Sequence, residues 1–166
     1  MDVQSPIDES SSHGQSMRWR LGGSGWASWL WSVGDVKVEV QASYVGPKVL
    51  AGFMNSVRDL LLGCHATFVT FLDEPGGTRV FFNRIEDKAF VQVVGFADLS
   101  EPASWWSDAK PVWNGRVPVE EFIGAFVVMV EELLAEHGTE GYRKRWAHDF
   151  PTTEWAALQT AHKSRR

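Results

Sequence analysis

Three short runs of apolar, β-branched and aromatic residues constrain the fold of this chain more than any other feature. They cover residues 66–73, 78–85 and 89–96, and turn-forming sequences separate them at 74–77 (Glu-Pro-Gly-Gly) and 86–88 (Glu-Asp-Lys). Short strand-forming runs joined by such turns are typical of an antiparallel β-meander. We therefore expect three consecutive strands that pair in one sheet.

The meander carries apolar side chains on both of its faces. Because successive side chains of a strand point to opposite faces, Phe68 points away from Val69, and Phe81 points away from Phe82. A sheet that is apolar on both faces must be covered twice. We expect helices on one face, and either the tryptophan-rich front segment or a second chain on the other.

Three helical patterns complete the fold. Apolar residues recur at helical spacing over 47–62, and a longer helix is expected over 118–137, with a stop at Gly138. Residues 122–130 of the long helix are apolar on nearly every side, which predicts burial on all sides. A short C-terminal helix over 152–162 is the internal candidate for its outer cover. These elements predict an α+β fold, with the antiparallel meander packed on the long apolar helix and the helix at about 47–62.

The remaining segments are interpreted from composition and alternation. Residues 1–16 contain almost no large apolar group, so we expect a disordered tail before one domain over 17–163. A short edge strand is expected over 17–21. Strict alternation of apolar and polar residues over 36–44 predicts a strand with one face exposed to solvent and one buried. Residues 98–117 contain two prolines and two adjacent tryptophans, and we expect a long loop there.

Composition restricts the classes of function. The formal net charge is −5, from 16 basic and 21 acidic residues, which disfavours nucleic acid as a partner and suits a basic protein. No apolar run is long enough to cross a membrane. Cys64 is the one cysteine, and the first 16 residues lack the apolar core of a secretory signal, so we expect a cytoplasmic protein.

Catalytic and metal-binding motifs are absent from the sequence. The five histidines are dispersed, no histidine pair stands at helical spacing, and no phosphate-binding glycine motif is present. We therefore expect no metal and no cofactor, and an enzyme is the less favoured class of protein.

Nine tryptophans in one chain favour recognition through aromatic side chains. The pair in the 98–117 loop is flanked by three acids, so affinity would come from the indoles and steering from the carboxylates. We predict a non-enzymatic protein-interaction surface made of Trp105, Trp106, Asp98, Glu101 and Asp108.

Two alternatives remain open. A small-molecule site between the sheet and the 98–117 loop would use His65, Arg79 and Arg84, either in a binding module or in an enzyme without a known motif. Self-association into a homodimer through residual apolar surface of the sheet or the long helix is the other alternative.

The chain also resembles bacterial immunity-type proteins, which are small inhibitors encoded beside toxins. The resemblance covers the architecture from about Met17 to His162. Its local sequence features are 74–77 (Glu-Pro-Gly-Gly), Gly138, 141–142 (Gly-Tyr), Trp146 and 150–151 (Phe-Pro). It implies an immunity or antitoxin-like inhibitor that occludes a protein partner, and it assigns no functional residue.

Overall fold

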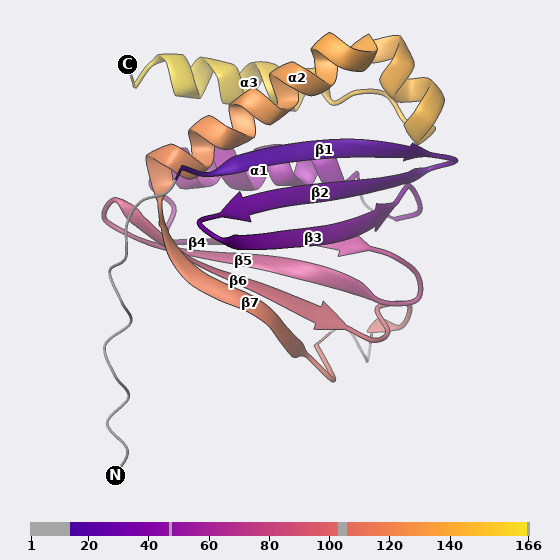
Figure 1. The fold of residues 1–166 in the computed structure, drawn as a ribbon, viewed down its shortest axis with the longest axis horizontal. Helices are drawn as coiled ribbons and strands as arrows, with labels where there is room; N and C mark the ends of the chain where they lie inside the picture. Colours follow the sequence, from indigo (N-terminus) through magenta and orange to yellow (C-terminus); the bar gives the residue numbers. More distant parts are fainter. Residues whose placement is uncertain (1–13, 47, 103–105, 166) are drawn as a thin grey trace.

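The computed structural model describes residues 14–46, 48–102 and 106–165, and this part of the chain forms strands and helices arranged as in Figure 1. Along the sequence they are β1 (Ser16–Gly23), β2 (Trp26–Val33), β3 (Val36–Ser43), α1 (Val49–Leu61), β4 (Ala66–Leu72), β5 (Gly77–Ile85), β6 (Lys88–Phe96), β7 (Lys110–Pro118), α2 (Val119–Trp146) and α3 (Thr152–Lys163). The α+β class and the expected helices are confirmed. The expected disordered tail lies outside the described residues up to position 13, and β1 begins at Ser16.

The strands form two antiparallel sheets. The first sheet has the order β1-β2-β3, and the second has the order β4-β5-β6-β7, so both are simple meanders. The predicted three-strand meander is confirmed as β4 to β6, with Phe68 opposite Phe81 and Phe81 opposite Gln92. The front of the chain thus contributes a sheet of its own.

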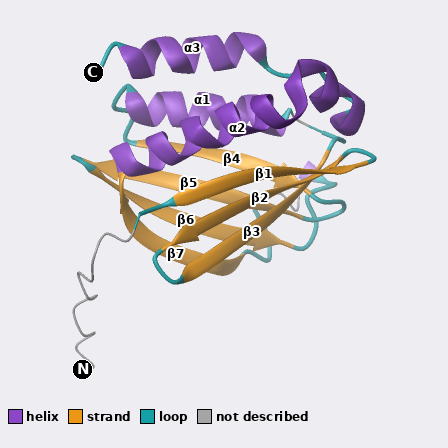
Figure 2. Cartoon of the chain, turned by 45° about the horizontal axis from the view of Figure 1, so that its top comes forward, coloured by secondary structure: helices purple, strands orange, loops and turns teal. Residues whose placement is uncertain are grey.

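The two sheets face each other, and helices close one side of the space between them (Figure 2). Helix α2 lies along β1, α1 packs on β4, and α3 packs on α1. The ring of Trp29 from the first sheet stacks on Phe71 from the second, with their centroids 6.0 Å apart. The same face of the second sheet is therefore covered by both the first sheet and the helices.

Aromatic rings fill the centre of the core. Trp29 stacks on Trp31 at 5.3 Å, and Phe53 of α1 meets Trp29 edge-on at 4.9 Å and Phe126 of α2 at 4.6 Å. Trp31 also contacts Phe122 edge-on at 5.3 Å. Such pairs add to the free energy gained by burying the rings, so the front tryptophans hold the layers together.

The structure corrects the expected loop over 98–117. Residues from Lys110 to Pro118 form β7, which pairs with β6 at the edge of the second sheet, so this part of the expected loop is a strand. The register shifts between Val93 and Val94. An edge strand tolerates prolines and a bulge because its outer N–H groups need no partner strand, and these prolines obscured the strand in the sequence.

The long helix also differs in detail from the expectation. Gly138 has φ 64° and ψ 178°, so the expected end of the helix is a kink, after which α2 continues to Trp146. The expectation of burial on all sides is wrong at Val128, which is exposed. The short helix α3 covers α1 rather than the outer side of α2. No helix of the described residues is long and apolar enough to cross a membrane.

Candidate interaction surface

The face of the second sheet that points away from the core carries an exposed aromatic surface. Side chains of β5 alternate, so Val80 and Phe82 point into the core while Arg79 and Phe81 point outward. Phe81 pairs with Phe68 of β4, which is 47% exposed, and their ring centroids lie 5.6 Å apart. An apolar cross-strand pair on an outer sheet face is unusual in a face that meets only water.

The segment between β6 and β7 adds Trp106 to this surface. The backbone N–H of Leu99 donates to the carbonyl of Pro75 at 2.6 Å, and the Leu99 side chain is buried, so the segment folds back over the turn between β4 and β5. The Trp106 ring lies 5.9 Å from Phe68 and 6.4 Å from Phe81, measured between centroids. We call Phe68, Phe81 and Trp106 the aromatic surface.

The side chain of Arg79 packs against the indole of Trp106. Its guanidinium carbon lies 4.2 Å from the Trp106 ring centroid and 4.8 Å from that of Phe96, so the cation sits against two aromatic faces. The Arg79 Nε donates to the hydroxyl of Thr70 at 3.2 Å. Burial lowers the pKa of the Arg79 guanidinium from its ordinary value, yet arginine remains charged in proteins.

Exposed acidic residues, which we call the acidic rim, lie on the segment that carries Trp106. Asp98, Glu101 and Asp108 are all exposed on the segment after β6. Asp98 accepts hydrogen bonds on one oxygen from the hydroxyl of Ser100 at 2.5 Å and from its backbone N–H at 2.8 Å. These bonds lower the pKa of Asp98, the hydroxyl contributing more, because they stabilise the ionised carboxylate.

The turn between β4 and β5 places two more acids at this end of the sheet. Asp73 and Glu74 immediately precede Pro75, whose carbonyl holds the folded-back segment. Lys110 is at the same end, opposite Gly95. Five carboxylates and this one lysine therefore lie on the turn, the folded-back segment and the start of β7, which makes the end acidic.

The structure brings some of the predicted interaction residues together. Trp106, Asp98, Glu101 and Asp108 lie on one folded-back segment, whereas Trp105 lies outside the described residues. Sequence reasoning did not assign Phe68 and Phe81 to this surface. The signal was present, because both residues occupy the outward positions of strands whose inward positions were already apolar.

The residues of the predicted small-molecule site do not converge on one cavity. Arg79 and Arg84 are five positions apart on β5, so they point to opposite faces of the sheet. Arg84 donates through Nη1 to the carbonyl of Leu60 on α1 and through Nε to that of Glu86 at 2.8 Å. His65 is exposed before β4, where its carbonyl accepts from the Arg84 backbone.

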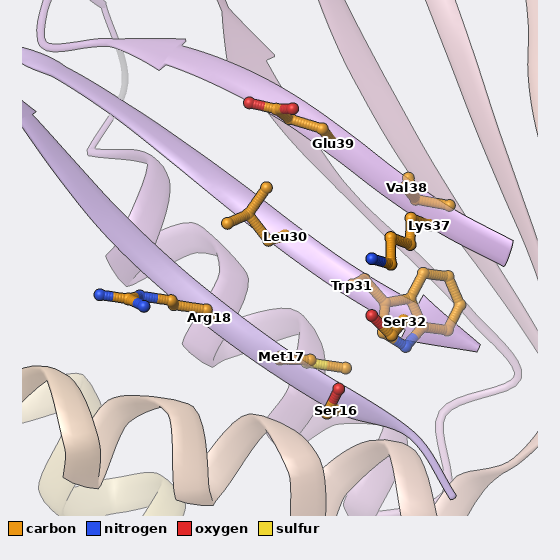
Figure 3. A pocket seen from close by; sticks show the side chains of 9 residues that line it. All are labelled: Ser16, Met17, Arg18, Leu30, Trp31, Ser32, Lys37, Val38 and Glu39. Atoms are coloured by element: carbon orange, nitrogen blue, oxygen red, sulfur yellow. The ribbon is translucent and has the colours of Figure 1, made fainter. Parts of the chain in front are cut away.

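A groove of about 450 Å³ lies on the outer face of the first sheet, and Figure 3 shows the side chains that line it. Leu30 lies between Arg18 and Glu39 in one row across the three strands. Each of these charges has its own partner, since Arg18 pairs with Glu136 at 3.8 Å and Glu39 with Arg20 at 3.2 Å. The charges are thus engaged in surface ion pairs rather than directed at one point.

Within the described part of the chain, no group of three or more histidine, cysteine, aspartate or glutamate side chains is placed to hold a metal ion. Comparisons with protein-family models, with curated proteins and with solved structures find no match to this chain. Functional inference therefore depends on the surface itself.

Proposed function

We propose that this chain is a non-enzymatic protein-interaction protein that binds its partner through the aromatic surface. The observation that carries the proposal is Trp106, which is 60% exposed and yet is held against Arg79, Phe68 and Phe81. Tryptophan is enriched among the residues that dominate binding energies. A ring that is ordered before binding loses little conformational entropy on association.

The acidic rim supports a basic partner. Asp98, Glu101 and Asp108 are exposed on the segment that carries the indole, and the whole chain has a formal net charge of −5. Carboxylates around an apolar centre accelerate association with a positively charged protein and disfavour an acidic one. The partner we propose therefore presents an apolar side chain for the aromatic surface with lysines or arginines around it.

The central test compares Trp106→Ala with Trp26→Ala. Trp26 is a matched control, because it is 43% exposed and lies on the first sheet. Affinity capture from an extract of the source organism, read by quantitative mass spectrometry, should recover a protein with the unaltered chain and with Trp26→Ala but not with Trp106→Ala. Titration of the purified pair should show at least about 30-fold weaker binding for Trp106→Ala.

The role of the acids is tested by neutralising them together. In Asp98→Asn, Glu101→Gln, Asp108→Asn, the association rate should fall and lose most of its dependence on salt. The matched control neutralises three exposed acids of α2, Glu131, Glu132 and Glu140. Equal effects of the two triple variants would assign the steering to net charge rather than to the rim.

The resemblance to immunity-type proteins makes an inhibitor of a toxin the specific form of this proposal. Co-expression with a toxin encoded beside the gene should restore growth with the unaltered chain and fail with Trp106→Ala. A second copy of the chain is the competing occupant of the surface. Sedimentation of the unaltered protein would reveal it as a dimer that Trp106→Ala converts to a monomer.

A further inference from the structure

A second candidate site lies on the helical side of the molecule, away from the aromatic surface. The first turns of α1 and α3 meet the end of α2 around an open cavity of about 230 Å³. The polar side chains that line it belong to Lys48, Tyr142, His148, Asp149, Thr152, Thr153 and Glu154.

Both helices begin at this cavity without a side-chain cap. Neither Lys48 at the start of α1 nor Pro151 at the start of α3 makes a capping hydrogen bond through its side chain. Leu50 and Ala51, in the first turn of α1, line the cavity, as do Thr152 and Thr153 of α3. The first N–H groups of a helix have no partner within the helix and carry partial positive charge, so they favour an anion.

Tyr142 is a second, independent observation that points to a ligand site. It lines the cavity although only 1% of its surface is exposed, and its ring packs edge-on against Phe150 at 5.4 Å. Its hydroxyl forms no hydrogen bond with any residue that the structure describes. Burial raises the pKa of Tyr142, so the hydroxyl keeps its proton and remains a donor.

The charges around the cavity leave room for a small anion. Lys48 carries an ammonium group, and the ring of His148 is held by its Nε2 atom, 2.9 Å from the Tyr44 carbonyl oxygen. Asp149 also lines the cavity, and its exposed carboxylate pairs with Arg143 at 3.4 Å, which offsets its charge. Glu154 is the acid that would oppose an anion, since it lies in the first turn of α3.

We propose that this cavity binds a small oxyanion, a phosphate or carboxylate group, between the first turns of α1 and α3. The Tyr142 hydroxyl, the Lys48 ammonium and the N–H groups of Leu50, Ala51 and Thr153 donate to its oxygens, whereas the N–H of Thr152 already donates to the carbonyl of Phe150 at 2.8 Å. The cavity would hold a phosphate-sized group together with a few water molecules, given that liquid water occupies about 30 Å³ per molecule.

The test titrates the full chain with inorganic phosphate and, separately, with acetate, at constant ionic strength in a chloride buffer. Amide chemical shifts of Leu50, Ala51 and Thr153 should change and saturate for at least one anion. Saturation with phosphate alone assigns a phosphoryl group, and saturation with acetate alone assigns a carboxylate. Linear, non-saturating changes with both anions would overturn the proposal.

Two conservative variants test the donors. Tyr142→Phe removes only the hydroxyl and should weaken binding about tenfold, as for a hydrogen bond to a charged group. Tyr44→Phe is its control, because Tyr44 is exposed and does not line the cavity. Lys48→Gln should also weaken binding, whereas Lys144→Gln, at an exposed position of α2, should not.

Protein stability separates this binding role from a purely structural one. In buffer without oxyanions, Tyr142→Phe should unfold at about the same temperature as the unaltered chain, because the hydroxyl bonds no residue that the structure describes. In saturating phosphate or acetate the unaltered chain should unfold at the higher temperature. Glu154→Gln should tighten binding by removing the opposing charge. Equal affinity of Tyr142→Phe and Tyr44→Phe for the anion would refute the assignment.

Discussion

The guanidinium carbon of Arg79 lies 4.2 Å from the ring centroid of Trp106, so a buried cation supports an exposed indole. The same group lies 4.8 Å from the ring of Phe96, and its Nε donates to Thr70. Arg79 therefore connects the sheet to the folded-back segment that carries the acids. It acts on the aromatic surface by positioning Trp106.

Replacing Arg79 by methionine should release Trp106 while it keeps much of the side-chain volume. Loss of the cation–π contacts and of the bond to Thr70 should lower the free energy of unfolding by about 1–2 kcal/mol, measured by urea denaturation. The indole N–H resonance of Trp106 should move toward its position in an unfolded chain.

Arg20→Met is the control for this prediction. Arg20 is an exposed arginine of the first sheet that pairs with Glu39 at 3.2 Å. Breaking an exposed ion pair of this kind should change the free energy of unfolding by less than about 1 kcal/mol. An unmoved Trp106 resonance in Arg79→Met would contradict the positioning role.

The meander, the first helix and the strand over 36–44 could be predicted because their patterns are local. Alternation along β3 and helical spacing along α1 record directly which side chains face the core. Strand β7 could not be predicted in this way. Its prolines and its bulge next to Val94 break the alternation, and its partner strand is identified only by the folded sheet.

The arrangement of the layers also could not be predicted from the sequence. Apolar residues on both faces of the meander show that both need contacts, but they do not show which segment supplies them. The tryptophan-rich front segment packs on the same face as the helices, as the stack of Trp29 on Phe71 shows. The outer face was therefore left to Phe68, Phe81 and Trp106.

Only part of the candidate site could be predicted from the sequence, for the same reason. Trp106 and its neighbouring acids are adjacent in sequence, so composition alone indicated them. The contact of Trp106 with Arg79 accompanies the hydrogen bond from Leu99 to Pro75, which folds the segment back. Long-range backbone contacts of this kind leave no periodic signal.

The carboxyl of Asp98 should titrate below its ordinary range. Hydrogen bonds from Ser100 depress its pKa in the folded chain, so the stabilisation is present above the unfolded-state pKa of about 3.9 and is lost as pH falls through the folded-state value. Ser100→Ala removes the larger cause, and the pKa should rise toward the ordinary value of an aspartate. The side-chain carbon shift of Asp98 measures this, and Ser32→Ala, on the first sheet, should leave it unchanged.

The stacked pair Trp29 and Trp31 should respond unequally to replacement by phenylalanine. Both rings are buried, but Trp31 donates through Nε1 to Gln15 at 3.1 Å, whereas the Nε1 of Trp29 is buried without a partner in the described structure. Trp31→Phe loses a hydrogen bond, and Trp29→Phe removes an unsatisfied donor. Chemical denaturation should show Trp31→Phe to be the costlier change by about 1 kcal/mol. Equal losses of stability in the two variants would mean that ring packing alone determines the cost of replacement.

Two glycines of α2 should respond to alanine with opposite signs. Nothing lies within 4 Å of a Cβ built on either Gly124 or Gly138, so steric space does not distinguish them. Gly138 has φ 64° and ψ 178°, a conformation that is essentially restricted to glycine, and Gly138→Ala should lower the free energy of unfolding by about 1–3 kcal/mol. Gly124 lies within the regular helix, so Gly124→Ala should raise it by about 0.5–1 kcal/mol. Thermal or urea unfolding of the two variants measures both effects. A stabilising Gly138→Ala would show that α2 straightens without cost, and the kink would then have no role in bringing the end of the helix, with Tyr142, to the starts of α1 and α3.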